Sequence, residues 1–276
     1  MVSHQQGRHE MGADEIRERW RHPNPGDSDD VKHWNSLASN FSKYAVPSAR
    51  SDKFMALIDG TYKGRRQYAL DVGCGAGQYS IALAARFRHV YGTDISEAMI
   101  DCARGLASKK KCDITYEIGD WASLPEGNPI LSRKYDIVIG HMTPAINSAE
   151  TLEKMISVCR GMCYLAKPTR REDAIADGFA EAAGLEPRDN DDLVPNILSL
   201  LWYLGYNPCT QYWSNHWGME RNPAELKKYF LRIMNSGKPL GPDADRRADE
   251  YLESITVDGT IKEDADVLIT NIYWRV

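Results

Sequence analysis

Three glycines at alternate positions, Gly73, Gly75 and Gly77, follow a short apolar run that begins at Tyr68. The residues after them repeat with helical spacing, so the sequence predicts a strand, a glycine turn and a helix in direct succession. Glycine can adopt positive φ in a tight turn, and it has no Cβ to hold a ligand away from the backbone. The pattern is typical of a turn that binds a nucleotide-like ligand, although a turn that binds nothing can use the same residues.

The spacing of these glycines distinguishes between ligands. The dinucleotide fingerprint, G-x-G-x-x-G, requires a glycine at the position that Gln78 occupies. In this chain the third glycine comes one residue earlier, and the pattern reads D-x-G-x-G-x-G from Asp71. It resembles motif I of the class I S-adenosylmethionine (SAM)-dependent methyltransferases. SAM has no pyrophosphate, so its site needs no phosphate cradle and must instead accept an adenosine, a sulfonium and a zwitterionic methionine end.

The resemblance implies a ribose contact at Asp94, the last residue of the second predicted strand. In the family an acidic residue at this point accepts hydrogen bonds from the ribose hydroxyls, and charge-assisted bonds of this kind are strong. The alternative is that Asp94 only helps to cap the helix that begins near Ser96. The resemblance also places Ile95 against the adenine and Met99 in the wall of the pocket.

The third predicted strand leads to a second adenine contact. In the family this corner presents an aspartate, here Asp120, to the adenine amino group. Trp121 either stacks beside the ring or is an ordinary core aromatic. The full set of cofactor-binding residues that the resemblance implies is Asp71, Gly73, Cys74, Gly75, Gly77, Asp94, Ile95, Met99, Asp120, Trp121 and His141.

Two histidines are candidates for a general base. His141 follows the fourth predicted strand at the carboxyl edge, where open α/β sheets bind their ligands. It either holds the substrate or takes its proton, or it is a structural histidine that offers only its backbone to SAM. His216 is the second candidate, because a neutral imidazole accepts a proton near pH 7. A base is required only when the methyl acceptor starts protonated.

Aromatic residues are the candidates for contact with the substrate. Trp34 lies in a helical pattern ahead of the core, where many small-molecule methyltransferases have a similar segment over the SAM pocket. The alternative is that Trp34 simply covers the sheet. Tyr44 is expected to point into the pocket. Trp213 belongs to the aromatic-rich segment 193–219, which forms either a substrate lid or plain core.

The strands that must position these residues alternate with helices along the chain. They are predicted at residues 68–72, 89–94, 114–120, 134–140, 161–166, 254–258 and 266–276. Lys167-Pro168 is expected to stop the fifth strand, and the last two strands are expected to form a closing antiparallel hairpin. The predicted fold class is α/β, a Rossmann-like, doubly wound, seven-stranded and mostly parallel sheet with an antiparallel last strand, plus N-terminal helices and an aromatic-rich insertion.

The domain organisation follows from these elements. We predict an N-terminal helical extension or lid over residues 1–50 and a SAM-dependent methyltransferase domain over residues 51–276. The aromatic-rich insertion occupies about residues 186–245, and residues 237–248 are expected to form a polar linker. Ser148 is expected to cap the helix that follows the fourth strand.

The composition restricts the partners. The chain has 276 residues, a net charge of −5 and 42% hydrophobic residues, which is ordinary for a soluble globular protein and argues against a nucleic-acid partner. Its six cysteines are scattered without metal-ligand spacing, so we expect reduced thiols and no metal site. Neither a signal peptide nor a membrane span is visible, so the expected location is cytoplasmic.

These observations predict a SAM-dependent methyltransferase that transfers a methyl group to a small-molecule acceptor by in-line displacement. One alternative is an NAD(P)-dependent oxidoreductase, against which Gln78 counts. The other is a regulator that binds SAM without catalysis.

Overall fold

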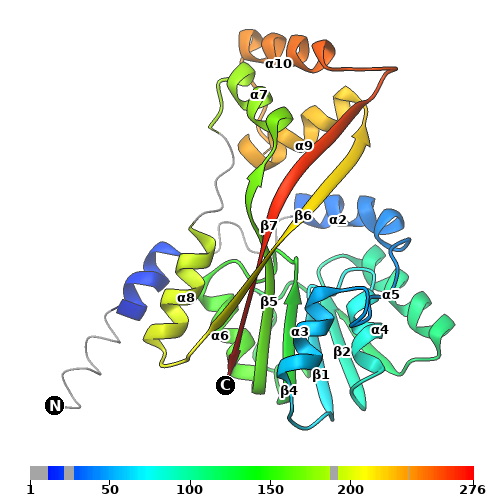
Figure 1. Ribbon diagram of the computed structural model, residues 1–276, viewed down its shortest axis with the longest axis vertical. Coiled ribbons are helices and arrows are strands. Elements are labelled where there is room, and N and C mark those ends of the chain that lie inside the picture. The colour runs from blue at the N-terminus through cyan, green and yellow to red at the C-terminus, as the bar shows by residue number, and fades with distance from the viewer. Residues whose placement is uncertain (1–11, 22–27, 187–191, 236) are drawn as a thin grey trace. The chain divides into compact units, whose positions relative to one another are not determined.

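The computed structural model describes residues 12–21, 28–186, 192–235 and 237–276 (Figure 1). The chain forms two compact units. Unit 1 comprises Met1–Lys167, Leu193–Gln211 and Asn271–Val276, and unit 2 comprises Pro168–Asp192 and Tyr212–Thr270. The domain boundaries predicted from the sequence remain a prediction.

Seven strands form one sheet in the order β3-β2-β1-β4-β5-β7-β6. Their bounds are β1 Tyr68–Val72, β2 His89–Asp94, β3 Ile114–Ile118, β4 Tyr135–His141, β5 Cys159–Glu172, β6 Cys209–Arg221 and β7 Ile261–Arg275. The pairs within β1 to β5 are parallel. β7 runs antiparallel to β5, because Val276 N donates to Gly161 O at one end and Thr169 Oγ1 donates to Leu268 O further along. The predicted fold class is confirmed.

One face of the sheet in unit 1 carries α3 (Lys53–Thr61), α4 (Gln78–Ala84) and α5 (Glu97–Lys110). Register partners point to the same face of a parallel sheet, so Asp71 of β1 and Tyr164 of β5, which both align with Ile139, share this face. Ser80 of α4 hydrogen-bonds Asp71, and Thr61 of α3 bonds the Tyr164 hydroxyl. The helices are therefore fastened to the sheet by polar side chains as well as by packing.

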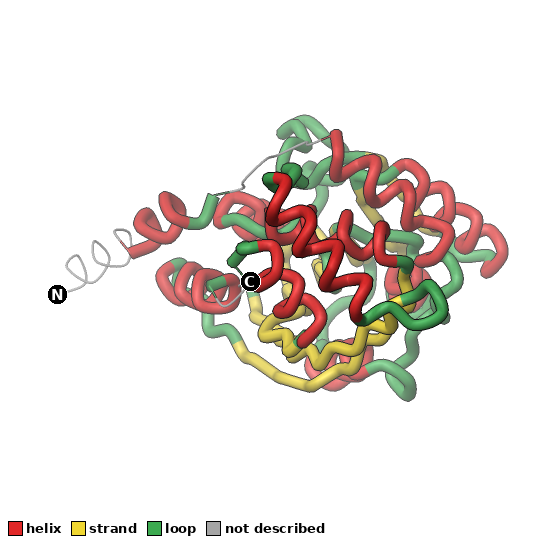
Figure 2. The backbone as a smooth tube through the Cα atoms, turned by 90° about the horizontal axis from the view of Figure 1, so that it is seen from above, coloured by secondary structure: helices red, strands yellow, loops and turns green. Residues whose placement is uncertain are grey.

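The opposite face carries α6 (Ala149–Val158) and α8 (Leu193–Tyr203). Leu70 and Val138, each one residue away in sequence from a residue of the first face, belong to one hydrophobic core with Leu152 of α6 and Leu200 of α8. The sheet of unit 1 is thus covered by helices on both faces, as the doubly wound prediction required. Figure 2 distinguishes the helices, in red, from the strands, in yellow.

Local sequence signals account for several helix starts. Ser148 caps α6 in a capping box, in which its side chain accepts from Thr151 N while the Thr151 hydroxyl accepts from Ser148 N. The predicted cap at Ser148 is therefore confirmed. At the N-terminal end, residues 12–19 are helical and α2 spans Ser28–Phe41.

Two strand predictions were wrong. β5 does not stop at Lys167-Pro168 but continues to Glu172. Proline holds the residue before it in an extended conformation, which suits a strand, and β7 supplies a partner beyond that point through Thr169. Residues 254–258 do not form the sixth strand; the sixth strand is β6, which includes the aromatic-rich residues 209–219.

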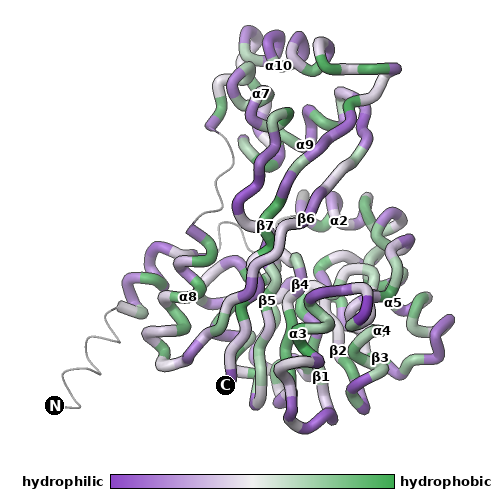
Figure 3. Tube along the Cα trace, viewed as in Figure 1, coloured by the Kyte–Doolittle hydropathy of each residue, from purple (hydrophilic) through white to green (hydrophobic). Residues whose placement is uncertain are grey.

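The polar linker predicted over residues 237–248 was also wrong, because α10 (Pro242–Ser254) begins within it. The signal was present in the sequence. Pro242 occupies the first helical turn, where its missing N–H costs nothing, and Asp243 and Asp245 lie at the positive end of the helix dipole. Figure 3 shows α10 alternating between hydrophilic and hydrophobic residues.

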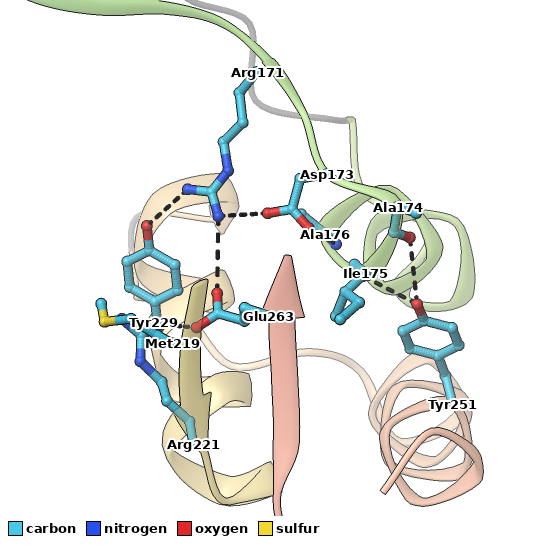
Figure 4. A network of polar contacts seen from close by, with 10 residues as sticks. All are labelled: Arg171, Asp173, Ala174, Ile175, Ala176, Met219, Arg221, Tyr229, Tyr251 and Glu263. Carbon is cyan, nitrogen blue, oxygen red and sulfur yellow. Dashed lines mark hydrogen bonds and ion pairs between the residues drawn. The ribbon is translucent and has the colours of Figure 1, made fainter. Parts of the chain in front are cut away.

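Unit 2 is built from α7 (Ala174–Ala183), α9 (Pro223–Asn235), α10 and parts of the long strands. Phe179, Phe230 and Leu252, one from each helix, are fully buried in its core. A network of charged side chains lies beside this core (Figure 4): Arg171 contacts Asp173 and Glu263, and Arg221 also contacts Glu263. Among the residues that the structure describes, no helix is long and apolar enough to cross a membrane.

Candidate functional site

The glycine turn between β1 and α4 has positive φ at Gly73, Gly75 and Gly77, with values of 65°, 53° and 86°. A Cβ on Gly73 would lie 1.9 Å from Thr143 Oγ1, so glycine is required there by packing. A Cβ on Gly75 would meet no heavy atom within 4 Å. The backbone at Gly75 therefore borders open space, and it is the part of the turn that a ligand can approach most closely.

Asp94 at the end of β2 is joined to this turn. Its Oδ2 accepts from Gly75 N at 2.9 Å and its Oδ1 accepts from Ser96 N at 2.9 Å. The following helix is capped by Ser96, whose hydroxyl accepts from Met99 N. Burial raises the pKa of Asp94, and the two backbone bonds oppose that rise. Each ionised oxygen has a second acceptor position, so the carboxylate can still receive two further donors.

Asp71 lies beneath the turn rather than at its surface. Its side chain is fully buried on β1 and accepts a 2.7 Å hydrogen bond from Ser80 Oγ of α4. Burial raises the pKa of Asp71 to about 7. Cys74, three residues after Asp71, is also buried, and burial raises the pKa of its thiol. These two side chains support the turn from below, while its backbone faces outward.

The predicted adenine corner is divided between surface and core. Ile95 and Asp120 are half-buried, whereas Met99 is buried beside Ala76 of the turn. Asp120 Oδ1 accepts from Ala122 N at 3.1 Å, so its carboxylate closes the turn that follows β3. Trp121 is 1% exposed and its indole donates to Thr151 O at 3.0 Å. Of the two alternatives for Trp121, this position corresponds to the core aromatic.

His141 is the last residue of β4, next to β1 in the sheet. Its ring stacks on Tyr79 with a centroid distance of 3.9 Å and lies 4.8 Å from the ring of Phe54. The Tyr79 hydroxyl donates to Asp52 Oδ2 at 2.8 Å, which fixes the stacking partner. Burial lowers the pKa of His141 to about 3, so the imidazole is neutral at physiological pH.

The comparison with known proteins agrees with this geometry. Residues 69–163, which run from β1 into β5, match a family model described as a methyltransferase domain. The chain carries a domain of the class I SAM-dependent methyltransferase family. This methyltransferase domain contains the glycine turn, Asp94, Asp120 and His141.

Individual relatives match parts of the chain. A ubiquinone biosynthesis O-methyltransferase of Coxiella burnetii is 37% identical over 78 residues, which is 28% of this chain and 31% of that protein. The chain thus spans about a third of the length of this relative. An uncharacterised protein of Haemophilus influenzae is 24% identical over 157 residues, covering 55% of this chain and 56% of that one. Among solved structures, precorrin 8w decarboxylase of Methanobacterium thermoautotrophicum has a TM-score of 0.49 and 16% identity, covering 84% of this chain and 94% of that one.

Trp34 of α2 lies beside the methyltransferase domain's glycine turn, and Tyr44 follows that helix. Trp34 is half-buried against the cluster of Ala38, Ala76 and Met99. Tyr44 is 59% exposed, with its ring edge-to-face against Phe41. The helix covers one side of the turn, and Trp34 is close enough to take part in either of the roles predicted for it.

His216 and Trp213 lie in unit 2. The His216 ring is between two carboxylates, with Nε2 2.9 Å from Asp264 Oδ1 and Nδ1 3.1 Å from Asp266 Oδ1. The hydrogen bond to Asp266 and the charge of Asp264 raise the pKa of His216. A ring that donates from both nitrogens has no lone pair to accept a proton, so this arrangement gives no support to a base at His216.

Several residues that touch the site were missed from the sequence. Tyr79 and Phe54 flank His141, yet each also fits an ordinary apolar helix face. Asn35 of α2 accepts from Ser96 Oγ at 2.7 Å, and Gln78 donates to Phe41 O at 2.6 Å. These bonds join elements that are distant in sequence, so no local pattern predicts them. Among the described residues, no group of three or more His, Cys, Asp or Glu side chains could hold a metal ion.

Proposed function

We propose that this protein is an enzyme that binds SAM at the carboxyl edge of β1 and β2 and transfers its methyl group to a small molecule. The observation that carries the proposal is the pairing of Gly75 with Asp94. The glycine backbone borders open space, and its N–H is bonded to a carboxylate that keeps two acceptor positions. An adenosyl ligand needs this combination of a bare backbone and an acceptor for its ribose hydroxyls.

Several other predicted cofactor residues have specific roles in the proposal. Asp94 accepts from the ribose, Ile95 lies against the adenine, and Asp120 faces the adenine amino group. Asp120 keeps unused acceptor positions besides the bonds that close its own turn. Met99 and Asp71 are buried, so they support the binding surface from behind rather than contact the cofactor through an exposed side chain.

SAM supplies an electrophilic methyl group on a sulfonium. The rest of the cofactor is the leaving group, a neutral thioether. The protein's own task is then to hold the acceptor atom about 3 Å from the methyl carbon and to exclude water. His141 is suited to orient the acceptor by a hydrogen bond. With a pKa near 3 it is a weak base at neutral pH, so the proposal favours acceptors that lose their proton without a strong base.

Two observations support a small-molecule acceptor. The net charge of −5 disfavours a surface that binds nucleic-acid phosphates. The Coxiella relative is named for O-methylation in ubiquinone biosynthesis, and its similarity to this chain is consistent with an acceptor of small size.

Calorimetry with SAM, its demethylated product S-adenosylhomocysteine (SAH) and NADH tests the cofactor. We expect micromolar binding of SAM and SAH and no binding of NADH; the reverse result would establish the oxidoreductase alternative. Transfer of a labelled methyl group from SAM to a panel of phenols, carboxylates, amines and thiols tests catalysis. Tight SAM binding without transfer to any acceptor would favour the regulator.

The ribose contact has its own test. Asp94→Ala removes the acceptor of the ribose bonds and one partner of Gly75 N, so we expect SAM affinity to fall at least several-fold. Far-ultraviolet circular dichroism should show the fold intact. An affinity equal to that of the wild type would refute the role of Asp94.

A further inference from the structure

Lys167 is a buried lysine at the carboxyl end of the unit 1 part of β5. Only 2% of the residue is exposed, and its Nζ donates to Thr143 O and Ile146 O, each at 2.6 Å. Lysine is almost never fully buried without a carboxylate partner. In the described parts of the chain no carboxylate forms an ion pair with Nζ, and burial lowers the pKa of Lys167 to about 7. Keeping an amine in this place costs free energy, so the bonds it makes require an explanation.

The two carbonyls belong to the turn in which β4 ends. Met142, the first residue of that turn, has φ of 54°, a left-handed conformation that is costly for any residue with a Cβ. Its N–H donates to Ala166 O at 2.9 Å, and Ala166 directly precedes Lys167. β5 therefore holds the strained turn twice, first through its backbone and then through the lysine side chain.

The same turn is in contact with the glycine turn. The Thr143 side chain occupies the space that a Cβ on Gly73 would need, with Oγ1 1.9 Å and Cβ 2.7 Å from that position. His141 immediately precedes Met142. A displacement of residues 142–146 would thus move the wall against which Gly73 packs and the strand end that carries His141.

We propose that Lys167 is a positioning residue, whose buried amine holds residues 142–146 against Gly73 and thereby sets the glycine turn and His141 for ligand binding. The cofactor part of this inference rests on the proposed function. The other part, that Lys167 holds residues 142–146 against Gly73, concerns only the ligand-free protein. The two parts can be tested separately.

Lys167→Met removes the donors and keeps the length of the apolar stem. Lys134→Met is the matched control, because Lys134 also donates to a backbone carbonyl, Ser157 O, but stands before the first residue of β4 at the opposite end of the strand. In the ligand-free protein we expect amide hydrogen exchange at the bonded N–H groups of Cys74, Gly75, Met142 and Ala145 to accelerate at least tenfold in Lys167→Met only. A merely structural lysine would lower the melting temperature without this localised change.

The second arm measures ligand binding. SAH affinity of Lys167→Met should fall about tenfold, whereas Lys134→Met should match the wild type. Thr143→Ala removes the contact with Gly73 and leaves the lysine bonds to the backbone in place. If Lys167 affects SAH binding through Thr143, the variant that combines Lys167→Met with Thr143→Ala should lose little more SAH affinity than Lys167→Met alone.

The outcomes separate the two proposals. If the wild type binds no SAH, the proposed function fails, and the exchange measurement still decides the role of Lys167. If exchange at Cys74 and Gly75 is unchanged in Lys167→Met, the positioning role is overturned even when SAH binds. Should Lys167→Met fail to fold, Thr143→Ala tests the contact between the turn and Gly73, which the proposal requires. Unchanged exchange at Cys74 and Gly75 in Thr143→Ala would then overturn the proposal.

Discussion

At the scale of single residues, glycine is needed at different positions of one motif for different physical reasons. Gly73 has no room for a Cβ because Thr143 packs against it, whereas Gly75 has room on its open side. The spacing of the glycines predicts the turn but cannot distinguish packing from ligand access. That distinction separates a residue needed for stability from one needed for binding.

A pair of alanine variants measures this difference. Gly75→Ala should cost about 1 kcal/mol of stability from its positive φ, and it should weaken SAM or SAH binding at least tenfold by placing a methyl group in the open space. Gly73→Ala should destabilise the protein by more, since the methyl group also overlaps Thr143. Urea unfolding and calorimetry provide the two measurements. If Gly75→Ala binds SAH as the wild type does, the ligand does not approach that backbone.

At the scale of elements, the end of β4 brings together side chains from three parts of the chain. His141 from β4, Tyr79 from α4 and Phe54 from α3 form one aromatic group. Strand periodicity correctly predicts that His141 reaches the carboxyl edge. Its neutrality depends on the rings around it, which only the packing of α3 and α4 supplies.

The pKa of His141 leads to a prediction about pH. Because burial lowers it to about 3, the imidazole should stay neutral from pH 5 to 8, and its NMR resonances should not titrate in that range. In the unfolded chain His141 binds a proton near pH 6.5, whereas in the folded chain it stays unprotonated. The free energy of unfolding therefore decreases as the pH falls below 6.5. An inflection of the His141 resonances between pH 5 and 8 would contradict the lowered pKa.

A second feature at the scale of elements is the charged network of unit 2, which links residues of different strands. Glu263 is 3% exposed and is contacted by both Arg171 and Arg221, while burial raises its pKa. Figure 4 shows how these side chains join β5, β6 and β7 beside α9. Removing the carboxylate leaves two partly buried guanidinium groups without their shared partner.

Glu263→Gln should therefore destabilise the protein by about 3 kcal/mol. The control is Glu250→Gln, which breaks an exposed pair with Arg246 on α10 and should cost less than about 0.5 kcal/mol. Urea unfolding at pH 7 measures both variants. Equal effects would show that burial adds nothing to the Glu263 interactions.

At the scale of the whole molecule, two buried groups disfavour their charged forms near neutral pH. The pKa of Asp71 is raised to about 7 and that of Lys167 is lowered to about 7. The folded protein keeps the Asp71 proton that the unfolded chain loses near pH 4, so this group reduces stability as the pH rises from 4 to 7. The Lys167 cost is present in full below pH 7 and declines as the pH rises towards 10.5.

The contribution of Asp71 can be isolated by substitution. Relative to Asp71→Asn, the wild type should lose about 2 kcal/mol of unfolding free energy between pH 5 and pH 7. Urea denaturation of both proteins at the two pH values measures this difference. A constant difference would show that the folded and unfolded states have the same Asp71 pKa.

Much of unit 1 could be predicted because its signals are local. A strand, a glycine turn and a helix lie within seventeen residues, from Tyr68 to Ala84, and an alternation of apolar strands and helices follows. Register then places the ends of β1, β2 and β4 at one edge, so the proximity of Gly75 and Asp94 follows from the order of strands. The errors fall where the chain leaves this regular alternation, at the end of β5, at residues 254–258 and at α10.

The sequence by itself determined the class of fold, the glycine turn and the acidic residue beside it, since each depends on neighbours within a few positions along the chain. Only the tertiary structure decided that Thr143 fills the space beside Gly73, that Trp121 lies in the core and that Lys167 holds the turn after His141. These facts depend on contacts between residues 21 to 70 positions apart, which are the separations from Ile146 to Lys167 and from Gly73 to Thr143. Such contacts leave no periodic trace in the sequence, because many different side chains can meet across a packed core.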